Sequence, residues 1–383
     1  MRNLRLLGLL LIAAAAGLLL LWTQSAGTQT VARILHYNWS SIEDNAVFPQ
    51  RTLQASPDPA RWTDGSPGQL PINLPPRGAF GGGELDKVLE ANDTVAFLVL
   101  LGNRVLLERY FQGYERTTPV MVFSVSKSIL SLLIGMAIED GLIASVRQPV
   151  TDFIPELAPQ GFSEVTIENL LQMTSGIDYT ENDNPLGEHV RLYYTDHLED
   201  ELLRLTLGQA PGTRFEYRSS DALLLGLILS RALGDQTITE YTQQRLWDRL
   251  GMEGEGSWGI DHAPDGLEKV GCCLSMTARD LARVGRLYLQ GGKWKGEQVV
   301  PESWIRRPFA VETSDGASPE YQYMWWRPSA GSGAIMAKGY LGQYLYLNPK
   351  HDIVIVRLGR SRGDLSDEAW VDLLTAIAEG ASR

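Results

Sequence analysis

Apolar positions fall into short β-rich runs near both ends of the region that begins at residue 85, and follow helical spacing between them. Residues 95–101 and 105–110 are two such runs, and the Gly102-Asn103 pair between them is typical of a hairpin turn. The β pattern returns beyond Pro301, over residues 322–326, 335–339, 343–348 and 353–358. We therefore predict an antiparallel sheet completed by segments from both ends of the chain.

Three helices are predicted around this sheet. Residues 124–139 are apolar on almost every side, which is expected of a helix in the middle of a protein. A short helix is predicted over 85–91, and an amphipathic helix over 367–378. Together with the strands, these helices predict an α/β (α+β) fold in which helices flank the sheet.

The stretch from 150 to 290 has a mostly helical pattern. Thr166 can cap a helix over 167–173, and Thr277 can cap a helix that begins at residue 278. We expect this stretch to form a mostly helical insertion that lies on the face or edge of the sheet. The seam between the two lobes is a natural place for a cleft.

The first 27 residues have the order of an export signal. Arg2 and Arg5 precede an apolar stretch over 6–22, which small polar residues follow. That stretch is long for a cleaved signal and slightly short for a spanning helix, so both a signal peptide and a single N-terminal membrane anchor are retained. Either alternative predicts an exported protein, periplasmic or otherwise extracytoplasmic.

A connector is predicted between this segment and the folded region. Residues 45–83 contain seven prolines and a run of three glycines, which favour extended chain over a packed unit. We therefore divide the chain into residues 1–27, an extended Pro-rich connector over 28–84, and one folded domain over 85–383.

Composition and charge exclude several function classes. The chain of 383 residues has 46 acidic and 34 basic residues, a net charge of −12 and no Lys/Arg cluster, which argues against nucleic-acid binding. The only two cysteines, Cys272 and Cys273, are adjacent and cannot join distant segments, and no Cys/His spacing fits zinc. We expect neither a metal nor another cofactor, and we interpret the cysteines as small core residues rather than a redox switch.

A serine and a lysine at the start of the predicted central helix are the strongest chemical signal. Ser124 and Lys127 are three residues apart, so their side chains share a helix face and can touch. Burial disfavours a charged ammonium, so an enclosed lysine can accept the serine proton. The alternative, a Ser-His-Asp triad, is disfavoured because the chain contains no Gly-x-Ser-x-Gly nucleophile elbow. Two of the five histidines, His189 and His197, lie in a polar stretch where they could contact a substrate.

Two further motifs follow the Ser-x-x-Lys pair along the chain. Tyr217-x-Ser219 precedes an apolar helical stretch, and Gly339 lies on a predicted strand and turn. With these three motifs in this order, the chain resembles the serine β-lactamase-related superfamily, which includes class C β-lactamases, D-alanyl-D-alanine carboxypeptidases, related esterases and 6-aminohexanoate-dimer hydrolases. The Ser-x-x-Lys pair matches the first motif of that superfamily, Tyr217-x-Ser219 the second, and the strand around Gly339 the third. The resemblance spans roughly residues 85–379 and implies a β-lactamase/transpeptidase-like fold.

Departures from these motifs indicate a branch of the superfamily. The second motif usually ends in Asn, not Ser219, and Ala337 stands where a cationic residue usually opens the third. Lys338 is one position along and is expected on the opposite face of the strand. These departures, and the run from Gly339 to Gln343, resemble the 6-aminohexanoate-dimer hydrolase and esterase members. That resemblance implies that Tyr179 lines the pocket, and that Gly339 and Gln343 bind substrate or support the site.

The resemblance also implies a mechanism that needs no cofactor. Ser124 would attack the carbonyl of a small amide or ester, and Lys127 and Tyr217 would share the proton transfers, with either one as the base. The oxyanion would rest on the backbone N–H groups of Ser124 and Tyr340. Ser219 is expected to hydrogen-bond Lys127 and orient it.

Two other functions stay open at this stage. The same fold could serve as a β-lactamase or a D-alanyl-D-alanine carboxypeptidase acting on cell-wall peptides, although Ala337 argues against this. It could also serve as a non-catalytic binding protein, because a fold does not fix a function.

Overall fold

The computed structural model describes Gly17, Thr23 and residues 27–37, 40–60, 62–64, 85–328 and 331–381. The segment interpreted as an export signal, 1–27, therefore lies almost wholly outside the described residues. Within the described ranges, no helix combines the length and the apolar character needed to cross a membrane.

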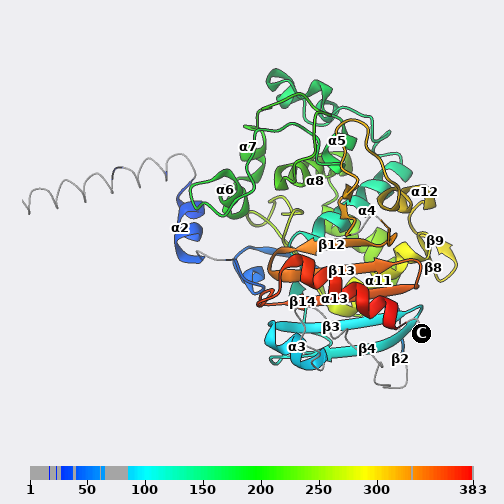
Figure 1. Ribbon diagram of the computed structural model, residues 1–383. Coiled ribbons are helices and arrows are strands. Elements are labelled where there is room, and N and C mark those ends of the chain that lie inside the picture. The colour runs from blue at the N-terminus through cyan, green and yellow to red at the C-terminus, as the bar shows by residue number, and fades with distance from the viewer. Residues whose placement is uncertain are drawn as a thin grey trace, which may run out of the picture.

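The largest sheet of the described chain has eight strands and is built from both chain ends, as the apolar pattern predicts (Figure 1). β3 pairs antiparallel with β14, with Leu98 opposite Val356, so segments more than 250 residues apart lie side by side. β2 and β4 are parallel, and the other neighbours are antiparallel. The spatial order is β10 (Tyr321–Gln322), β11 (Trp325–Trp326), β12 (Ile335–Gly339), β13 (Gln343–Asn348), β14 (Ile353–Gly359), β3 (Thr94–Leu101), β4 (Arg104–Tyr110) and β2 (Thr63–Asp64).

Helices cover both faces of this sheet. Successive residues of a strand point to opposite faces, and neighbouring residues of β3 accordingly join different cores. Phe97 packs with α3 (Leu85–Ala91) and α13 (Asp367–Gly380), while Leu98 packs in the larger core that includes α11 (Ala278–Leu289). The α/β architecture with flanking helices is thus confirmed.

The central helix is α4 (Val125–Glu139), and it is buried on every side, as its composition predicts. Thirteen of its residues are buried, from Val125 to Ala137. It packs against α8 (Ser219–Leu233) and against the strands β12 and β13. Ser124 is the N-cap residue, so the helix begins one position later than the sequence predicts.

The upper lobe in Figure 1 holds most of the remaining helices. The Thr166 side chain accepts from the Asn169 backbone N–H, and Thr277 does the same for Asp280, so both predicted caps are confirmed. The first of these helices ends at Leu171, two residues before the predicted end. The helix that Thr166 caps is α5 (Ile167–Leu171). The other α-helices are α6 (Glu188–Tyr194), α7 (Leu198–Leu202), α9 (Ile238–Thr242), α10 (Asp248–Leu250) and α12 (Glu302–Ile305).

A second, four-stranded sheet includes two strands, β6 and β7, from the stretch predicted as a mostly helical insertion. Its order is β1-β6-β7-β5, and the small hairpin β8-β9 lies apart from it. The strands inside the insertion are too short to give a clear period-two pattern, which is why the sequence did not indicate them. Their bounds are β1 (Gln50–Leu53), β5 (Val120–Met121), β6 (Gly256–Gly259), β7 (Leu274–Met276), β8 (Lys293–Trp294) and β9 (Glu297–Gln298).

The segment expected to be an extended connector is partly folded, which corrects that prediction. α2 (Thr28–Tyr37) packs against α6, and its Val31 and Ile34, three residues apart on one helix face, are buried. β1 adds an edge strand to the second sheet. The Gly-rich run and most of the prolines belong to residues 65–84, which lie outside the described chain.

Candidate active site

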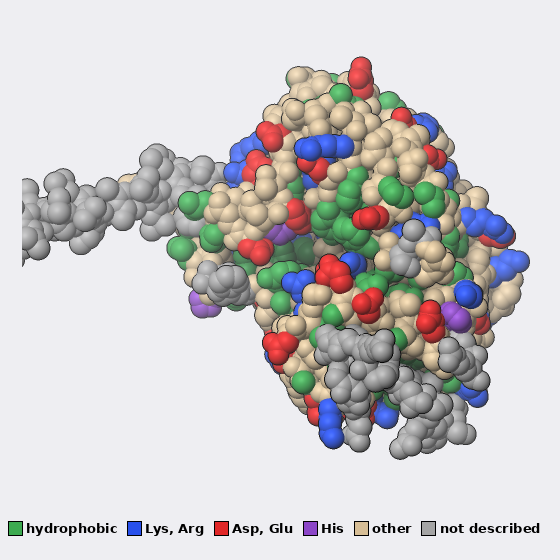
Figure 2. Space-filling model, viewed as in Figure 1, with side chains coloured by type: hydrophobic (Ala, Val, Ile, Leu, Met, Phe, Trp, Pro, Cys, Tyr) green, Lys and Arg blue, Asp and Glu red, His purple; other side chains and the backbone are tan. Residues whose placement is uncertain are grey.

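A cavity of about 760 Å³ opens where the helical lobe meets the end of β12. Acidic, basic and hydrophobic side chains are interspersed on the face of the molecule seen in Figure 2. The wall is built mainly by the start of α4, the 179–194 segment, the turn before α8, the 269–272 segment and the end of β12. Further lining residues come from other parts of the chain: Ile34, Ser40, Leu223, Trp326, Arg362 and Asp367. This is the size of a pocket for a small molecule.

Ser124 and Lys127 are in contact at the edge of this cavity. Lys127 Nζ donates to Ser124 Oγ at 2.7 Å and to the backbone carbonyl of Gly271 at 2.8 Å. The Lys127 side chain is 1% exposed, whereas Ser124 lines the cavity. The lysine is therefore fixed behind the serine hydroxyl and shielded from bulk water.

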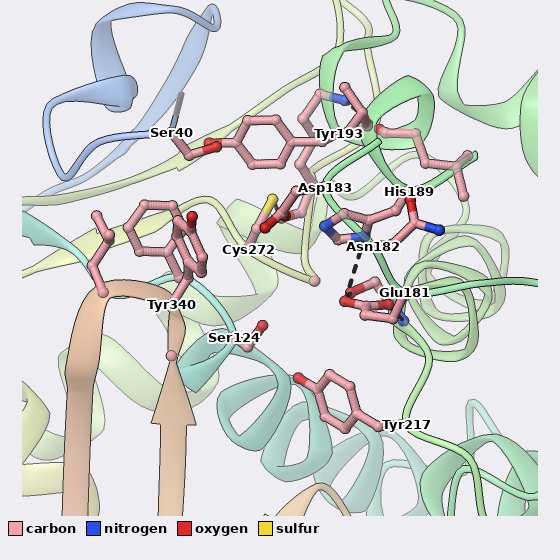
Figure 3. Close-up of a pocket in the computed structure, with 18 of the residues that line it drawn as sticks. Ser40, Ser124, Glu181, Asn182, Asp183, His189, Tyr193, Tyr217, Cys272 and Tyr340 are labelled. Atoms are coloured by element: carbon pink, nitrogen blue, oxygen red, sulfur yellow. Dashed lines mark hydrogen bonds and ion pairs between the residues drawn. The ribbon is translucent and has the colours of Figure 1, made fainter. Parts of the chain in front are cut away.

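Tyr217 completes this group. Its ring centroid lies 5.2 Å from Lys127 Nζ, and its hydroxyl end points toward Ser124 (Figure 3). Trp326 stacks on the Tyr217 ring with centroids 5.5 Å apart and also lines the cavity, while Trp325 is buried. The structure thus brings together the three residues predicted to perform the chemistry.

Gly339 allows β12 to approach the turn that carries the serine. A Cβ at this position would overlap the backbone carbonyl oxygen of Val122. Phe123, directly before Ser124, has a positive φ of 46°, an uncommon conformation for a residue with a side chain. The rings of Phe123 and Tyr340 lie 5.7 Å apart, so the two backbone segments predicted to form the oxyanion hole are neighbours.

Ser219 does not contact Lys127, which corrects the expected role. Its hydroxyl donates to Glu181 Oε1 at 2.7 Å, and its backbone N–H donates to Glu181 Oε2 at 2.8 Å. Ser219 is the first residue of the 15-residue helix α8, where free N–H groups and the helix dipole favour a carboxylate. The Ser219 hydroxyl therefore hydrogen-bonds to the Glu181 carboxylate, and Lys127 hydrogen-bonds to the Gly271 carbonyl instead of to Ser219.

Tyr179 lines the cavity, as the resemblance implies, and belongs to a polar group that the sequence did not single out. Its hydroxyl lies 2.7 Å from His189 Nδ1, which is 3.4 Å from Glu181 Oε1. Burial, and then the Glu181 carboxylate, raise the pKa of the Tyr179 hydroxyl well above its ordinary value. His189 thus lines the cavity, whereas His197 does not.

Gln343 supports the site from behind and does not contact the cavity. Its side chain is fully buried and donates to the carbonyls of Gly359 and Tyr340, at 2.7 and 3.1 Å. It also accepts from the Gly359 N–H at 3.0 Å. Gln343 therefore ties the Tyr340 turn to β14, so of its two predicted roles only support agrees with the structure.

Lys338 lines the same cavity as the serine, which corrects the expectation that it lies on the far face. Ala337 and Lys338 do point in opposite directions, but it is Ala337 that is buried in the core. Lys338 Nζ lies 5.0 Å from the ring centroid of Trp326. The prediction that Ala337 and Lys338 lie on opposite faces of the strand is therefore confirmed. The prediction of which face lines the cavity is wrong.

Cys272 and Cys273 are joined by a disulfide, a bond that their interpretation as small core residues did not include, while both lie in or against the core as that interpretation expects. Cys273 is buried, and Cys272 lines the cavity next to Gly271, the carbonyl partner of Lys127. Sequence adjacency alone could not distinguish the bonded pair from the reduced one.

The sheet, the buried central helix and the Ser-Lys pair at its start define a protein of the β-lactamase/transpeptidase-like class. The family model described as Beta-lactamase matches residues 85–378, and the chain belongs to this family.

One curated protein and two solved structures are similar to this chain. The chain is 32% identical over 321 residues to a 6-aminohexanoate-dimer hydrolase of Paenarthrobacter ureafaciens, which covers 78% of this chain and 81% of that protein. A structure from Bacillus anthracis, provisionally assigned as a 6-aminohexanoate-dimer hydrolase, has a TM-score of 0.77 at 24% identity and covers 90% of this chain and 94% of that one. A class C β-lactamase has a TM-score of 0.58 at 17% identity and covers 77% of this chain and 93% of that one. The two structural likenesses concern the fold alone.

Proposed function

We propose that this protein is a serine hydrolase that cleaves a small amide or ester through an acyl-enzyme on Ser124. The observation that carries the proposal is the 2.7 Å contact between Ser124 Oγ and Lys127 Nζ at the wall of a cavity that Tyr217 also lines. The similarity to a 6-aminohexanoate-dimer hydrolase supports an acyl-transfer reaction of this class.

The first half of the reaction forms the acyl-enzyme. The Ser124 hydroxyl loses its proton to Lys127 and Tyr217, which act as one coupled system, and Oγ bonds to the substrate carbonyl carbon. The carbonyl oxygen takes the negative charge, held by the backbone N–H groups of Ser124 and Tyr340. The bond to the leaving nitrogen or oxygen then breaks, and the leaving group takes the proton from the same pair.

The second half regenerates the enzyme. A water molecule gives a proton to the Lys127 and Tyr217 pair and attacks the acyl carbon. The bond from this carbon to Ser124 Oγ breaks, the serine recovers its proton, and the carboxylic acid leaves. No cofactor takes part in either half.

The experiment compares initial rates of the protein and of Ser124→Ala on a short-chain p-nitrophenyl ester and a matched amide. We expect turnover that disappears with the serine, and a mass increase of one acyl group on the intact unsubstituted protein. Equal rates in both proteins would contradict the assignment of Ser124. Binding that survives the substitution, without turnover of any acyl substrate, would favour a non-catalytic binding protein.

A β-lactamase or D-alanyl-D-alanine carboxypeptidase is the second candidate, and Lys338 is the observation that favours it. This residue places a cation in the cavity wall, which Ala337 cannot do, and a cation there could attract the carboxylate of a penicillin or a peptide. Stable acylation of Ser124 by benzylpenicillin, measured by intact mass, would support this candidate. Rapid ester turnover with no penicillin adduct would oppose it.

We further propose that the protein acts outside the cytoplasm. The support is the order of basic, apolar and small residues over 1–27. Cell fractionation of the full chain and of a chain that lacks these residues tests this. Cytoplasmic recovery of the full chain would contradict it, and N-terminal sequencing distinguishes a cleaved signal from a retained anchor.

A further inference from the structure

A second buried lysine lines the cavity and has no role in the proposed reaction. The Lys269 side chain is 1% exposed, yet it forms part of the cavity wall. Its Nζ donates to the backbone carbonyl of Leu192 at 3.2 Å and lies 5.1 Å from the ring centroid of Phe48. An ammonium group has three donors, so this environment satisfies it only in part.

The carboxylates near Lys269, those of Asp261 and Asp196, accept hydrogen bonds from other groups. The two oxygens of Asp261 accept from the backbone N–H groups of Leu198 and Leu267, each at 2.7 Å. Asp196 accepts from Thr30 Oγ1 at 2.9 Å. Across the described chain, no carboxylate oxygen lies within ion-pair distance of Lys269 Nζ.

Burial is the main cause of the lowered pKa of Lys269. Loss of solvent lowers the pKa of Lys269 to about 7, Asp261 opposes this shift, and Arg33 acts in the same direction as burial. Arg33 donates to the carbonyls of Tyr194 and Asp261, at 3.1 and 3.2 Å. An anion that enters the cavity would restore the stabilisation that Lys269 lost on burial.

The two other cations of the cavity wall differ from Lys269 in different ways. Arg362 Nη1 lies 3.3 Å from Asp367 Oδ1, so its charge has a carboxylate partner. Lys338 Nζ lies near the Trp326 ring, as Lys269 Nζ lies near that of Phe48, but the Lys338 residue is only half-buried. Of these three cations, Lys269 is the one that is both fully enclosed and without an ion-pair partner among the described residues.

We propose that Lys269 binds a carboxylate of the substrate in the same cavity in which Ser124 attacks the scissile bond. The proposal rests on the proposed hydrolase function, and it assigns the substrate class: amides or esters that carry a terminal carboxylate. The contacts that support it are the single backbone acceptor of Nζ and the absence of an ion pair within the described residues.

The kinetic test uses pairs of substrates that differ only in a terminal carboxylate. One pair carries it on the acyl side, as mono-p-nitrophenyl suberate against p-nitrophenyl octanoate. The other carries it on the leaving side, as N-acetyl-6-aminohexanoate against N-acetylhexylamine. We expect kcat/KM to favour the carboxylate member of at least one pair by about 10- to 100-fold, the range of a hydrogen bond between charged groups.

The variants locate the effect. Lys269→Met should reduce this preference to near unity, while Lys269→Arg should retain part of it. Lys350→Met, at an exposed turn residue, is the matched control and should keep the full preference. No preference in the unsubstituted protein, or a preference that survives Lys269→Met and disappears in Lys338→Met, would overturn the proposal.

A binding measurement separates this proposal from the proposed function. In the Ser124→Ala background, calorimetry with suberate monoamide and octanamide should show tighter binding of the carboxylate, and Lys269→Gln should abolish the difference. This result would support the carboxylate site even if no substrate were turned over. Equal binding of the two probes would overturn it even if the serine chemistry were established.

Discussion

Ser219 and Glu181 form a two-bond contact at the start of α8, with the hydroxyl donating at 2.7 Å and the backbone N–H at 2.8 Å. Tyr217 lies two residues earlier in the chain, so the contact fixes the turn that carries the tyrosine. The same carboxylate lies 3.4 Å from His189 Nδ1, which also lines the cavity. One acidic side chain therefore joins the tyrosine turn to the 179–194 segment.

Loss of the Glu181 carboxylate should reduce turnover more than it reduces binding. Glu181→Ala leaves two Ser219 donors without their partner and frees the Tyr217 turn, and we expect kcat to fall about 10-fold or more, since unpaired buried donors cost about 1–3 kcal/mol. Glu181→Gln keeps an acceptor and should lose less. Ser219→Ala keeps the backbone bond and should be the mildest of the three. An Ala variant with unchanged kcat would show that the contact does not position Tyr217.

The three polar residues proposed for catalysis should behave as one unit. Lys127→Ala and Tyr217→Phe should each lower kcat by about 10²–10⁴-fold, because each removes a member of the proton-transfer pair. The double variant should be little worse than the more damaging single variant, because groups that act together are not additive. Steady-state kinetics on the p-nitrophenyl ester measures this. Multiplicative losses in the double variant would mean that the two residues act independently.

The close approach of Gly339 to Val122 predicts a specific sensitivity. Gly339→Ala introduces a Cβ that overlaps the Val122 carbonyl, so the end of β12 must move and take the Tyr340 N–H away from the reacting carbonyl. We expect kcat to fall about 10²-fold, the effect of losing one oxyanion donor. Gly331→Ala, whose Cβ would meet no atom within 4 Å, is the control. Equal activity in both variants would exclude Tyr340 from the oxyanion hole.

The sequence predicted those features that depend on local spacing or on strong periodicity. The contact between Ser124 and Lys127 follows from three-residue spacing on one helix. The pairing of β3 with β14 follows from two β-rich runs at opposite ends of the chain that need partners. Gly339 was singled out by its motif, and its overlap with Val122 gives the physical reason for a glycine there.

The features that the sequence did not predict depend on contacts between distant segments. Glu181, the hydrogen-bond partner of Ser219, is 38 positions away in the chain. Nothing in the sequence near Ser219 indicates that this carboxylate, and not Lys127, is its partner. Alternation along β12 separates Ala337 from Lys338, but only the packing of the helical lobe decides which face becomes the cavity. The position of α2 against α6 and the enclosure of Lys269 likewise arise from tertiary packing.

Gly135 should be intolerant of substitution although it lies in the middle of a helix. Alanine normally stabilises a helix by about 1 kcal/mol relative to glycine. In α4, however, a Cβ at this position would lie 2.6 Å from the ring of Trp304, which is buried and cannot move freely. We expect Gly135→Ala to lower the free energy of unfolding by about 1–3 kcal/mol, the usual cost of overpacking. Gly380→Ala, with no atom within 4 Å of its Cβ, should not be destabilised, and denaturant titration compares the two.

Asp221 should make the protein less stable as the pH rises. Its side chain is fully buried in α8, and the burial raises its pKa from 3.8 to about 7 despite a hydrogen bond from Ser175 at 2.8 Å. The folded state therefore keeps a proton that the unfolded chain releases near pH 4. Stability that is present below about pH 4 is lost as the pH rises toward 7, and the total is about 4 kcal/mol.

Asp221→Asn tests this dependence directly, because an amide cannot ionise and can still accept from Ser175. The Tm of the variant should match that of the unsubstituted protein near pH 4 and exceed it increasingly up to pH 8. The same series on Asp372→Asn, at an exposed position of α13, is the matched control, because it makes the same change of side chain outside the core. A constant Tm difference for Asp221→Asn between pH 4 and 8 would mean that the carboxyl titrates alike in the folded and unfolded states, because only a difference in proton binding gives stability a slope with pH.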